Sequence, residues 1–570
     1  MSRQLPGLAQ LRRYRRSWLR YDVLAGVTVA AYLIPQVMAY AQVAGLPAVV
    51  GLWAIVGPLL VYAVLGSSRQ LSVGPESTTA LMTAAAVGAL TAGDPERYAA
   101  LAAALALVVG GLCVVGWVGR LGFLGDLLSR PVLVGYMAGI AAIMVVSQLG
   151  KLTGIEVHAE SFGGEVAYVV KHLDEVSMPT LALAASVLAL LLVGNHLFPR
   201  SPMPLVGMLA ATAVVAVLDL ESHGIAVVGQ IPAGLPAPSL PPVSLGDLTS
   251  LLLPAVGVAI VGYSDNILTG RTFATRNGYA IEGNQEFLAL GAANIASGVM
   301  QGFPVSSSGS RTAIGDSLGS RTQLYSLVAL ASVLLSMVFL RPVLAAFPTA
   351  ALGAIVVYAA TRLVDVPEFR RIARFRRSEL LIAISTTVAV LAFDVLYGVL
   401  VAIGLSILDL LRRVARPHDG ILGFAPGVAG MHDVDDYPKA TAVEGLLVYR
   451  YDSPLFFANV EDFKRRALAS LDRVDSPTEW FLLNAEANVQ VDITAMDALE
   501  ELREKLARRG IVFAMARVKQ EVREDLRLTG FVELVGEDHI FATLPTAVQA
   551  YVRWHEEKHG VPPAGAPPAA

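Results

Sequence analysis

Apolar runs of about 20 residues recur along most of this chain, from about Leu24 to about Leu411. Each run is long enough to cross the hydrocarbon core of a bilayer, and short loops separate the runs. Only 16% of the 570 residues are charged and the mean hydropathy is +0.59, whereas soluble domains carry about 25% charged residues. We therefore expect a polytopic α-helical membrane protein over most of the length.

The remaining composition excludes several classes of protein. The formal net charge is −4, so we expect no nucleic-acid partner. The one cysteine, Cys113, lies in an apolar run, which rules out a disulfide framework and argues against thiol chemistry. We find no convincing nucleophile–base pair or metal cluster, so we expect neither an enzyme nor a bound cofactor beyond a coupling H⁺ or Na⁺.

Arginine placement predicts the orientation of the spans. Arginines cluster before the first apolar run (residues 12–20), at residues 370–377 and at residues 412–416. By the positive-inside rule all three clusters are cytoplasmic, whereas the acidic connection at residues 151–179 is external. We expect about fourteen spans, two of them short or broken, in a plasma membrane with both termini cytoplasmic.

Charge and alternating patterns return near residue 412, which predicts a small cytoplasmic α/β domain after the membrane region. Expected strands lie at residues 445–451, 479–486 and 511–518, and amphipathic helices at 460–471 and 498–510. The predicted organisation is an N-terminal segment, a transmembrane domain, a linker, the α/β domain and a disordered tail, at residues 1–21, 22–413, 414–438, 439–556 and 557–570.

The stretch "GFPVSSSGSRT" (302–312) interrupts the apolar pattern between two spans. Irregular backbone at membrane depth is tolerated only where protein buries it or where it lines a polar cavity. A helix that begins near Ser306 would point its N–H groups, which carry partial positive charge, into the membrane interior. With the hydroxyl groups of Ser308 and Ser310 and the charge of Arg311, this segment is predicted to hold a small anion.

The first half of the chain contains a counterpart, "SVGPESTTALM" (72–82), in which Gly-Pro again precedes hydroxyl residues, Ser77 among them. The offset that relates Pro75 to Pro304 also relates Gln36 to Asp265, and both are polar residues within apolar stretches. Paired interruptions at matching positions are typical of inverted-repeat transporters and indicate the substrate site.

Asp265 is the clearest candidate for ion coupling, because a carboxylate at membrane depth is costly and usually functional. Thr269 lies four residues later on the same helix face, so the pair could hold Na⁺. Alternatively, Asp265 could bind a proton, since the ionised group would repel an anion and the neutral group would admit it. Glu76 leaves two interpretations open: a second proton site, or a carboxylate that complements the first turn of its helix.

Three segments strongly resemble the SulP sulfate permease family with its C-terminal STAS domain: "DVLAGVTVAAYLIPQVMAYAQVAGLP" (22–47), "GSSRQLSVGPESTTALM" (66–82) and "GFPVSSSGSRTA" (302–313). The resemblance covers nearly the whole chain and is closest to actinobacterial putative sulfate transporters. It implies seven-plus-seven inverted-repeat helices, a core domain that moves against a gate domain, and a homodimer in the lipid bilayer. It also implies a small anion bound between the third and tenth helices.

The resemblance assigns roles to residues that match the family's motifs. Gln36 and Tyr40 match its first-helix contacts, and Asp265 matches an acidic position in the eighth helix. Ser308, Ser310 and Arg311 match its tenth-helix positions, whereas Glu76 stands where many relatives have an uncharged residue. The predicted anion-binding set is Gln36, Tyr40, Glu76, Ser77, Ser306, Ser308, Ser310 and Arg311, and the predicted coupling set is Asp265 and Thr269.

Three functions remain open at this stage: proton-coupled sulfate symport, Na⁺-coupled transport of bicarbonate or another anion, and a membrane-anchored STAS signalling protein. Serine hydroxyls and backbone N–H groups serve all of these anions, so the sequence does not set the substrate. Two further motifs were weighed. "HEEKH" (555–559) matches a zinc-protease pattern but lacks an evident third ligand, so we expect no metal there. In "VDITAMD" (491–497), Thr494 is expected to cap a helix, with phosphorylation as the alternative.

Overall fold

A computed structural model of the chain describes residues 5–91, 94–123, 129–159, 161–198, 201–232, 234–474 and 476–566. The side chains of residues 89, 394–397, 399 and 403 also lie outside this description. The chain forms two compact units, Met1–Ser406 and Ile407–Ala570.

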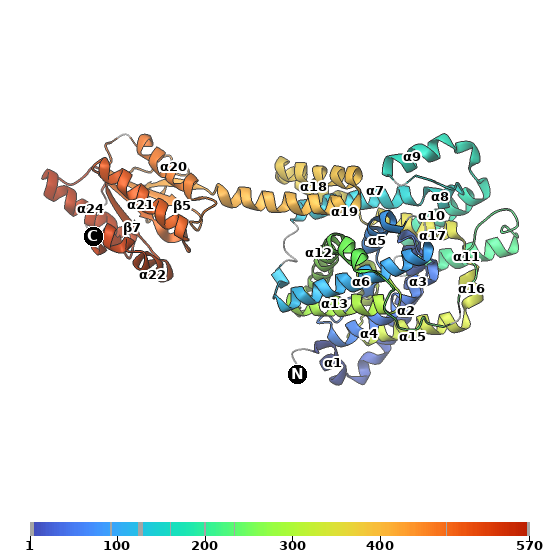
Figure 1. Ribbon diagram of the computed structural model, residues 1–570. Coiled ribbons are helices and arrows are strands. Elements are labelled where there is room, and N and C mark those ends of the chain that lie inside the picture. The colour runs from blue at the N-terminus through green and yellow to red at the C-terminus, as the bar shows by residue number, and fades with distance from the viewer. Residues whose placement is uncertain are drawn as a thin grey trace. The chain divides into compact units, whose positions relative to one another are not determined.

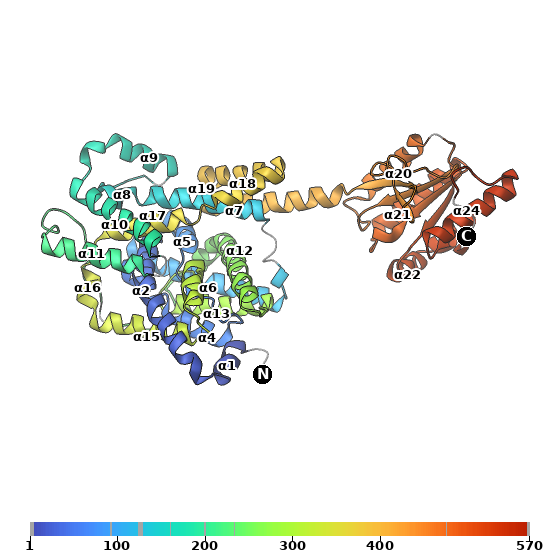
Figure 2. The same cartoon turned by 180° about the vertical axis from the view of Figure 1, so that it is seen from behind.

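The first unit is built almost entirely of helices (Figures 1 and 2). Its helices of ten or more residues are α2 (Leu19–Val43), α4 (Val56–Leu65), α5 (Ser77–Thr91), α6 (Pro95–Val118), α7 (Arg130–Ser147), α9 (Phe162–Lys171), α10 (Met178–Leu197), α11 (Met203–Val217), α12 (Leu245–Arg276), α13 (Gly283–Val299), α15 (Leu324–Phe339), α17 (Thr349–Thr361) and α18 (Val366–Phe375). The long helix α19 (Arg377–Ala415) begins in this unit and continues past its boundary at Ser406. Shorter helices are α1 (Pro6–Arg12), α3 (Ala48–Trp53), α8 (Leu149–Thr153), α14 (Gly309–Ser317) and α16 (Arg341–Ala345).

The described residues include seven helical segments that are long and apolar enough to cross a membrane, and two shorter apolar helices, Met203–Val217 and Leu324–Phe339. In both views α13 runs beside α6 and α15 runs beside α2, so segments far apart in sequence are packed together (Figures 1 and 2). The polytopic helical architecture expected from the sequence is confirmed, whereas the total of about fourteen spans stays a prediction.

Two helices of the first unit begin in the interior of the bundle. A two-residue strand, β1 (Val73–Gly74), precedes α5, and β2 (Ser306–Ser307) precedes α14. These strands pair in antiparallel fashion, Val73 opposite Ser307 and Gly74 opposite Ser306, and all four residues are buried. The two interruptions that the sequence related by one offset therefore lie against each other, as an inverted repeat requires.

Close packing between α2 and α3 gives the first testable prediction. A Cβ atom on Gly51 would lie 2.0 Å from the carbonyl oxygen of Val37, so Gly51→Ala must push two helices apart. Overpacking of this kind costs about 1–3 kcal/mol. We expect Gly51→Ala to lower the midpoint temperature of thermal unfolding of the purified protein in detergent. The matched control is Gly111→Ala in α6, where a Cβ meets no atom within 4 Å; equal midpoints for the two variants would contradict this packing.

The second unit contains a six-stranded sheet in the order β4-β3-β5-β6-β7-β8. The strands are β3 (Asp419–Phe424), β4 (Met431–Asp433), β5 (Leu446–Tyr451), β6 (Trp480–Asn484), β7 (Val512–Ala516) and β8 (Ile540–Phe541). Strands β5 to β8 are parallel, and β3 and β4 are antiparallel to their neighbours. The helices are α20 (Val460–Ser470), α21 (Ile493–Arg508), α22 (Gln520–Leu528), α23 (Phe531–Val535) and α24 (Leu544–His559).

Both faces of this sheet are covered. Alternate strand residues such as Tyr449 and Phe481 join one apolar cluster with α20 to α23, and their neighbours Val448 and Leu482 join a second cluster with α24. The small α/β domain predicted from the sequence is confirmed, and its three expected strands and two expected helices are present as β5, β6, β7, α20 and α21.

Three local expectations differ from the structure. The stretch assigned to a linker (residues 414–438) contains β3 and β4. Two glycines within β3 and the three-residue length of β4 hide the strand pattern from sequence reading. The tail assigned to residues 557–570 begins inside α24; residues 567–570 lie outside the described part. The Glu444 N–H donates to the Ala564 carbonyl at 2.9 Å, and the Ala564 N–H donates to the Glu444 carboxylate at 3.2 Å. Asp492, not Thr494, caps α21, because its side chain accepts from the Ala495 N–H at 2.8 Å.

Candidate functional site

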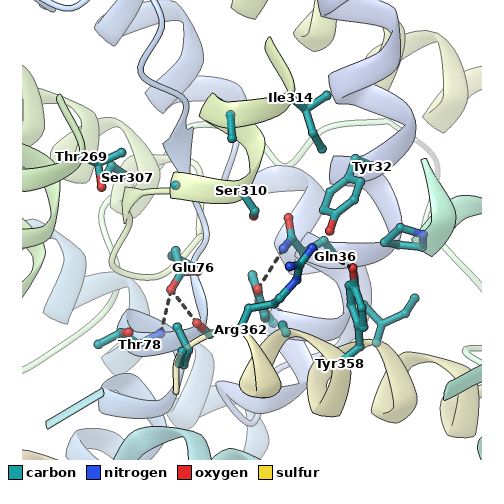
Figure 3. Close-up of a pocket in the computed structure, with 18 of the residues that line it drawn as sticks. Tyr32, Gln36, Glu76, Thr78, Thr269, Ser307, Ser310, Ile314, Tyr358 and Arg362 are labelled. Atoms are coloured by element: carbon teal, nitrogen blue, oxygen red, sulfur yellow. Dashed lines mark hydrogen bonds between the residues drawn. The ribbon is translucent and has the colours of Figure 1, made fainter. Parts of the chain in front are cut away.

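A cavity of about 700 Å³ lies in the first unit where the two interrupted helices meet (Figure 3). Its lining comes mainly from α2, the start of α5, α12, one face along the whole of α14 and the second half of α17. Seven residues of the predicted site line it: Gln36, Tyr40, Glu76, Ser77, Asp265, Thr269 and Ser310. Ser306, Ser308 and Arg311 are buried but are absent from the described lining. The fold thus brings most of the predicted residues to one hollow.

The N-terminus of α14 opens on this cavity. Ser308 caps the helix, because its hydroxyl accepts from the backbone N–H of Arg311. The first N–H groups of a helix have no acceptor within it, so those of Gly309 and Ser310 remain for another partner. Both residues line the cavity, and a Cβ atom on Gly309 would meet nothing within 4 Å. An anion in the cavity can therefore approach the positive end of this helix closely.

Arg311 lies behind the cavity wall and is fully buried. Its Nε donates to Ser72 Oγ at 3.2 Å, and its Nη1 donates to Gln36 Oε1 at 3.3 Å and to the Pro75 carbonyl at 3.0 Å. Among the described residues, its Nη2 has no hydrogen-bond partner and no carboxylate forms an ion pair with it. The guanidinium thus ties together the first helix and the two interruptions, while its charge stays uncompensated at short range.

Gln36 connects this charge to the cavity. Its Oε1 accepts from Arg311, and its Nε2 donates to the Tyr40 hydroxyl at 2.9 Å, one helical turn later on α2. Because the Tyr40 oxygen accepts from Gln36, its own proton is free to point into the cavity that Tyr40 lines. Successive hydrogen bonds polarise one another, so the chain Arg311–Gln36–Tyr40 strengthens the Tyr40 O–H as a donor toward the cavity.

Glu76 gives the beginning of α5 a negative charge that the beginning of α14 lacks. Its carboxylate accepts from the Ser77 hydroxyl at 2.6 Å and from the Thr78 N–H at 3.0 Å, as Figure 3 shows. A carboxylate therefore already complements the first turn of α5, which is one of the two interpretations that the sequence left open. Of the two helix starts, α5 is thus closed by a side-chain carboxylate, whereas α14 has no such group at its start among the described residues.

Asp265 faces the same cavity from α12, together with Thr269. The hydroxyl of Ser307, in β2, donates to Asp265 Oδ2 at 3.2 Å. Among the described residues no basic side chain forms an ion pair with Asp265. An ionised Asp265 would repel an anion at the nearby start of α14, whereas the neutral carboxyl would not. Asp265 is therefore a lining carboxylate whose charge would act on an anion at the start of α14.

Several lining residues were missed by the sequence reading. Figure 3 shows Tyr32, Gln36, Tyr358 and Arg362 on one side of the cavity and Glu76, Thr78 and Ser307 on the other. Tyr32 lies one turn before Gln36 on α2, so helical periodicity gave a usable signal for it. Arg362 donates to the Tyr358 hydroxyl at 3.3 Å and gave no signal, because its position before an arginine-rich segment resembles that of an interfacial anchor.

The open start of α14, two carboxylates and, behind the wall, a buried arginine without an ion pair among the described residues surround one hollow in a polytopic α-helical membrane protein. The chain belongs to the sulfate permease family, whose profile matches residues 19–386; a STAS domain profile matches residues 437–547. The resemblance stated from the motifs is therefore confirmed.

Relatives with curated descriptions match along nearly the whole chain. A probable sulfate transporter of Mycobacterium tuberculosis strain H37Rv is 61% identical over 548 residues, which cover 96% of this chain and 98% of the relative. The chloroplastic sulfate transporter 4.1 of Arabidopsis thaliana is 31% identical over 583 residues, which cover 97% of this chain and 84% of the relative.

Solved structures share the fold at low sequence identity. The structure of SLC26A9 matches with a TM-score of 0.87 and 22% identity, covering 98% of this chain and 94% of that one. The transmembrane domain of the cyanobacterial bicarbonate transporter BicA matches with a TM-score of 0.61 and 23% identity, covering 69% of this chain and 98% of that one. At these identities the likeness establishes architecture alone.

Proposed function

We propose that this protein is a secondary active transporter that carries sulfate across the plasma membrane together with protons. The observation that carries the proposal is the open N-terminus of α14 beside the Arg311–Gln36–Tyr40 chain, on a cavity of about 700 Å³. A helix N-terminus and oriented O–H and N–H donors suit a tetrahedral oxyanion. The descriptions of the Mycobacterium and Arabidopsis relatives support sulfate as the anion.

The two carboxylates in the cavity support proton coupling. Sulfate carries two negative charges, and Asp265 and Glu76 line the same hollow that would receive it. Binding is more favourable when one of these groups is protonated, so sulfate and a proton should enter together. In liposomes containing the purified protein, uptake of ³⁵S-sulfate should rise as external pH falls. Uptake that is unchanged by an imposed pH gradient would contradict symport.

Na⁺-coupled transport of bicarbonate or another anion is the second candidate, and one observation favours it. Asp265 and Thr269 lie four residues apart on α12 and both line the cavity, so a carboxylate and a hydroxyl oxygen are available to a cation. The same liposomes separate the two functions. Uptake of labelled bicarbonate that requires external Na⁺, with no response to sulfate, would replace the first proposal with this one.

The remaining expectations complete the proposal. Both termini lie in the cytoplasm, as the arginine clusters indicate, and the protein forms a homodimer, as the family resemblance implies; it performs no chemical conversion. A STAS domain that signals while the membrane part only anchors it is the distant alternative. That alternative predicts that no labelled anion crosses the membrane, so the liposome assay tests it too.

Tyr40→Phe provides a prediction for the proposed donor chain. The change removes one hydroxyl from a buried side chain and leaves Gln36 and Arg311 in place. A hydrogen bond to a charged group contributes about 1.5–3 kcal/mol, so the apparent affinity for sulfate should fall by roughly 10- to 100-fold. Sulfate concentration series in proteoliposomes measure this as a raised KM. Tyr168→Phe in α9, outside the described cavity lining, is the control; a wild-type KM in Tyr40→Phe would exclude Tyr40 as a ligand.

A further inference from the structure

The second unit contains a cluster of metal-ligating side chains that transport does not use. Glu479, His555 and His559 each offer one ligand atom, and these atoms all lie within 4.8 Å of one another. The two histidines are those of "HEEKH" (555–559), for which the sequence supplied no third ligand. The fold supplies it from a position far away in the chain.

The arrangement follows from how α24 packs on the sheet. His555 and His559 lie one turn apart on one face of α24, with ring centroids 4.4 Å apart. Glu479 directly precedes β6, an interior strand of the sheet, and α24 packs against β6 and β7. The C-terminal end of α24 thus meets the beginning of β6. The helix is ordered to His559, which the sequence reading had placed in a disordered tail.

His555 is held in the tautomer that a metal ligand needs. Its Nδ1 lies 3.0 Å from the carbonyl oxygen of Val561, which can only accept, so Nδ1 carries the proton and Nε2 bears the lone pair. The ring is 8% exposed, so its orientation is fixed by packing. Metal-binding histidines in proteins characteristically donate their other N–H to a carbonyl or carboxylate. This hydrogen bond is an observation independent of the clustering itself.

We propose that Glu479, His555 and His559 bind a divalent transition-metal ion, best matched by Zn²⁺, with water in the fourth position. Two imidazoles and one carboxylate are a ligand set that Zn²⁺ accepts, with metal–ligand distances of about 2.0–2.2 Å. A tetrahedral site then requires ligand atoms roughly 3.4 Å apart. His559 Nε2 already lies 2.9 and 3.2 Å from the two carboxylate oxygens of Glu479. Small side-chain rotations therefore complete the site.

Lys558 competes with the ion. Its Nζ lies 2.9 Å from Glu479 Oε1 and above the ring of Trp554, so it occupies part of the carboxylate that the metal needs. Metal binding must displace this ammonium group. The proposal therefore predicts that removal of a positive charge strengthens metal binding, a result that a purely structural role for the cluster would not give.

The test uses the full-length protein in detergent, stripped of metal with a chelator. Isothermal titration with Zn²⁺ should give one ion per chain, and Co²⁺ should give the intense visible absorption of a tetrahedral complex. His559→Gln alters an exposed residue and should weaken binding by on the order of 100-fold. Lys558→Gln should tighten it. His432→Gln, at a half-buried histidine in β4 of the same unit, is the control and should bind as wild type.

Two results would overturn the proposal. One is Zn²⁺ binding that His559→Gln and His432→Gln weaken equally, because such binding would be distributed over surface histidines. The other is no binding by wild type and by Lys558→Gln under conditions where both remain monodisperse. Neither result bears on sulfate uptake, which depends on the cavity in the other unit, so failure here and failure of the transport proposal are separable.

Discussion

Arg311→Lys is expected to reduce sulfate uptake by on the order of 100-fold while the protein still inserts and remains monodisperse. The guanidinium donates to Ser72, Gln36 and the Pro75 carbonyl from a fully buried position, and lysine offers a compact ammonium that cannot span these three acceptors. The charge is retained, but Gln36 is released and the Tyr40 hydroxyl loses its orientation. Initial rates of ³⁵S-sulfate uptake in proteoliposomes measure the loss.

The control for this change is Arg97→Lys, at a half-exposed arginine that pairs with Asp247 at 3.0 Å. Ion pairs at such exposed sites contribute little, so this variant should transport at the wild-type rate. Gln36→Met serves as a second variant, because it breaks the chain while leaving the arginine in place. Wild-type uptake by both Arg311→Lys and Gln36→Met would show that the donor chain has no part in anion binding.

Asp265→Asn should abolish pH-driven accumulation of sulfate while leaving exchange of internal for external sulfate intact. Asparagine resembles the protonated carboxyl in shape and charge, so the anion still enters, but no proton is carried with it. Ser307 can donate to the amide oxygen of asparagine as it does to Asp265 Oδ2 at 3.2 Å, so the contact between β2 and α12 should persist. Parallel assays of accumulation under a pH gradient and of exchange at equal pH separate these effects.

Glu76→Gln distinguishes between the two carboxylates of the cavity. Glu76 caps α5, so its neutral analogue should retain both accumulation and its pH dependence if Asp265 is the coupling group. Asp247→Asn, at a surface ion pair, controls for loss of any carboxylate. Accumulation that persists in Asp265→Asn and disappears in Glu76→Gln would transfer the coupling role to Glu76.

The sequence predicted the parts of the site that depend on local pattern. Gly-Pro followed by hydroxyl residues marks a helix that begins within the membrane, and a shared offset related the two copies. The antiparallel pairing of Val73 with Ser307 is the structural counterpart of that offset. Gln36 and Asp265 could be predicted as site residues because burying a polar side chain at membrane depth costs free energy in any orientation.

What the sequence did not reveal depends on contacts between distant segments. Arg311 remains a predicted anion ligand, and its guanidinium donates to Gln36 and to the Pro75 carbonyl, contacts with distant segments that no local pattern encodes. In the sequence, Arg362 precedes an arginine-rich segment, a position typical of an interfacial anchor. In the structure it follows α17 and lines the cavity. Glu479 precedes β6 and is far from "HEEKH" in the sequence. Its position beside the two histidines results from the packing of α24 on the sheet, so the sequence alone did not predict the third ligand of the proposed metal site.

The account depends most on an anion binding at the N-terminus of α14. Selenate has the shape and charge of sulfate and scatters anomalously, so crystals of the protein grown with selenate locate the anion directly. We predict one anomalous peak per chain within hydrogen-bonding distance of the Gly309 or Ser310 backbone N–H and of the Tyr40 hydroxyl. A peak elsewhere in the membrane unit, with the start of α14 filled only by water, would contradict the account.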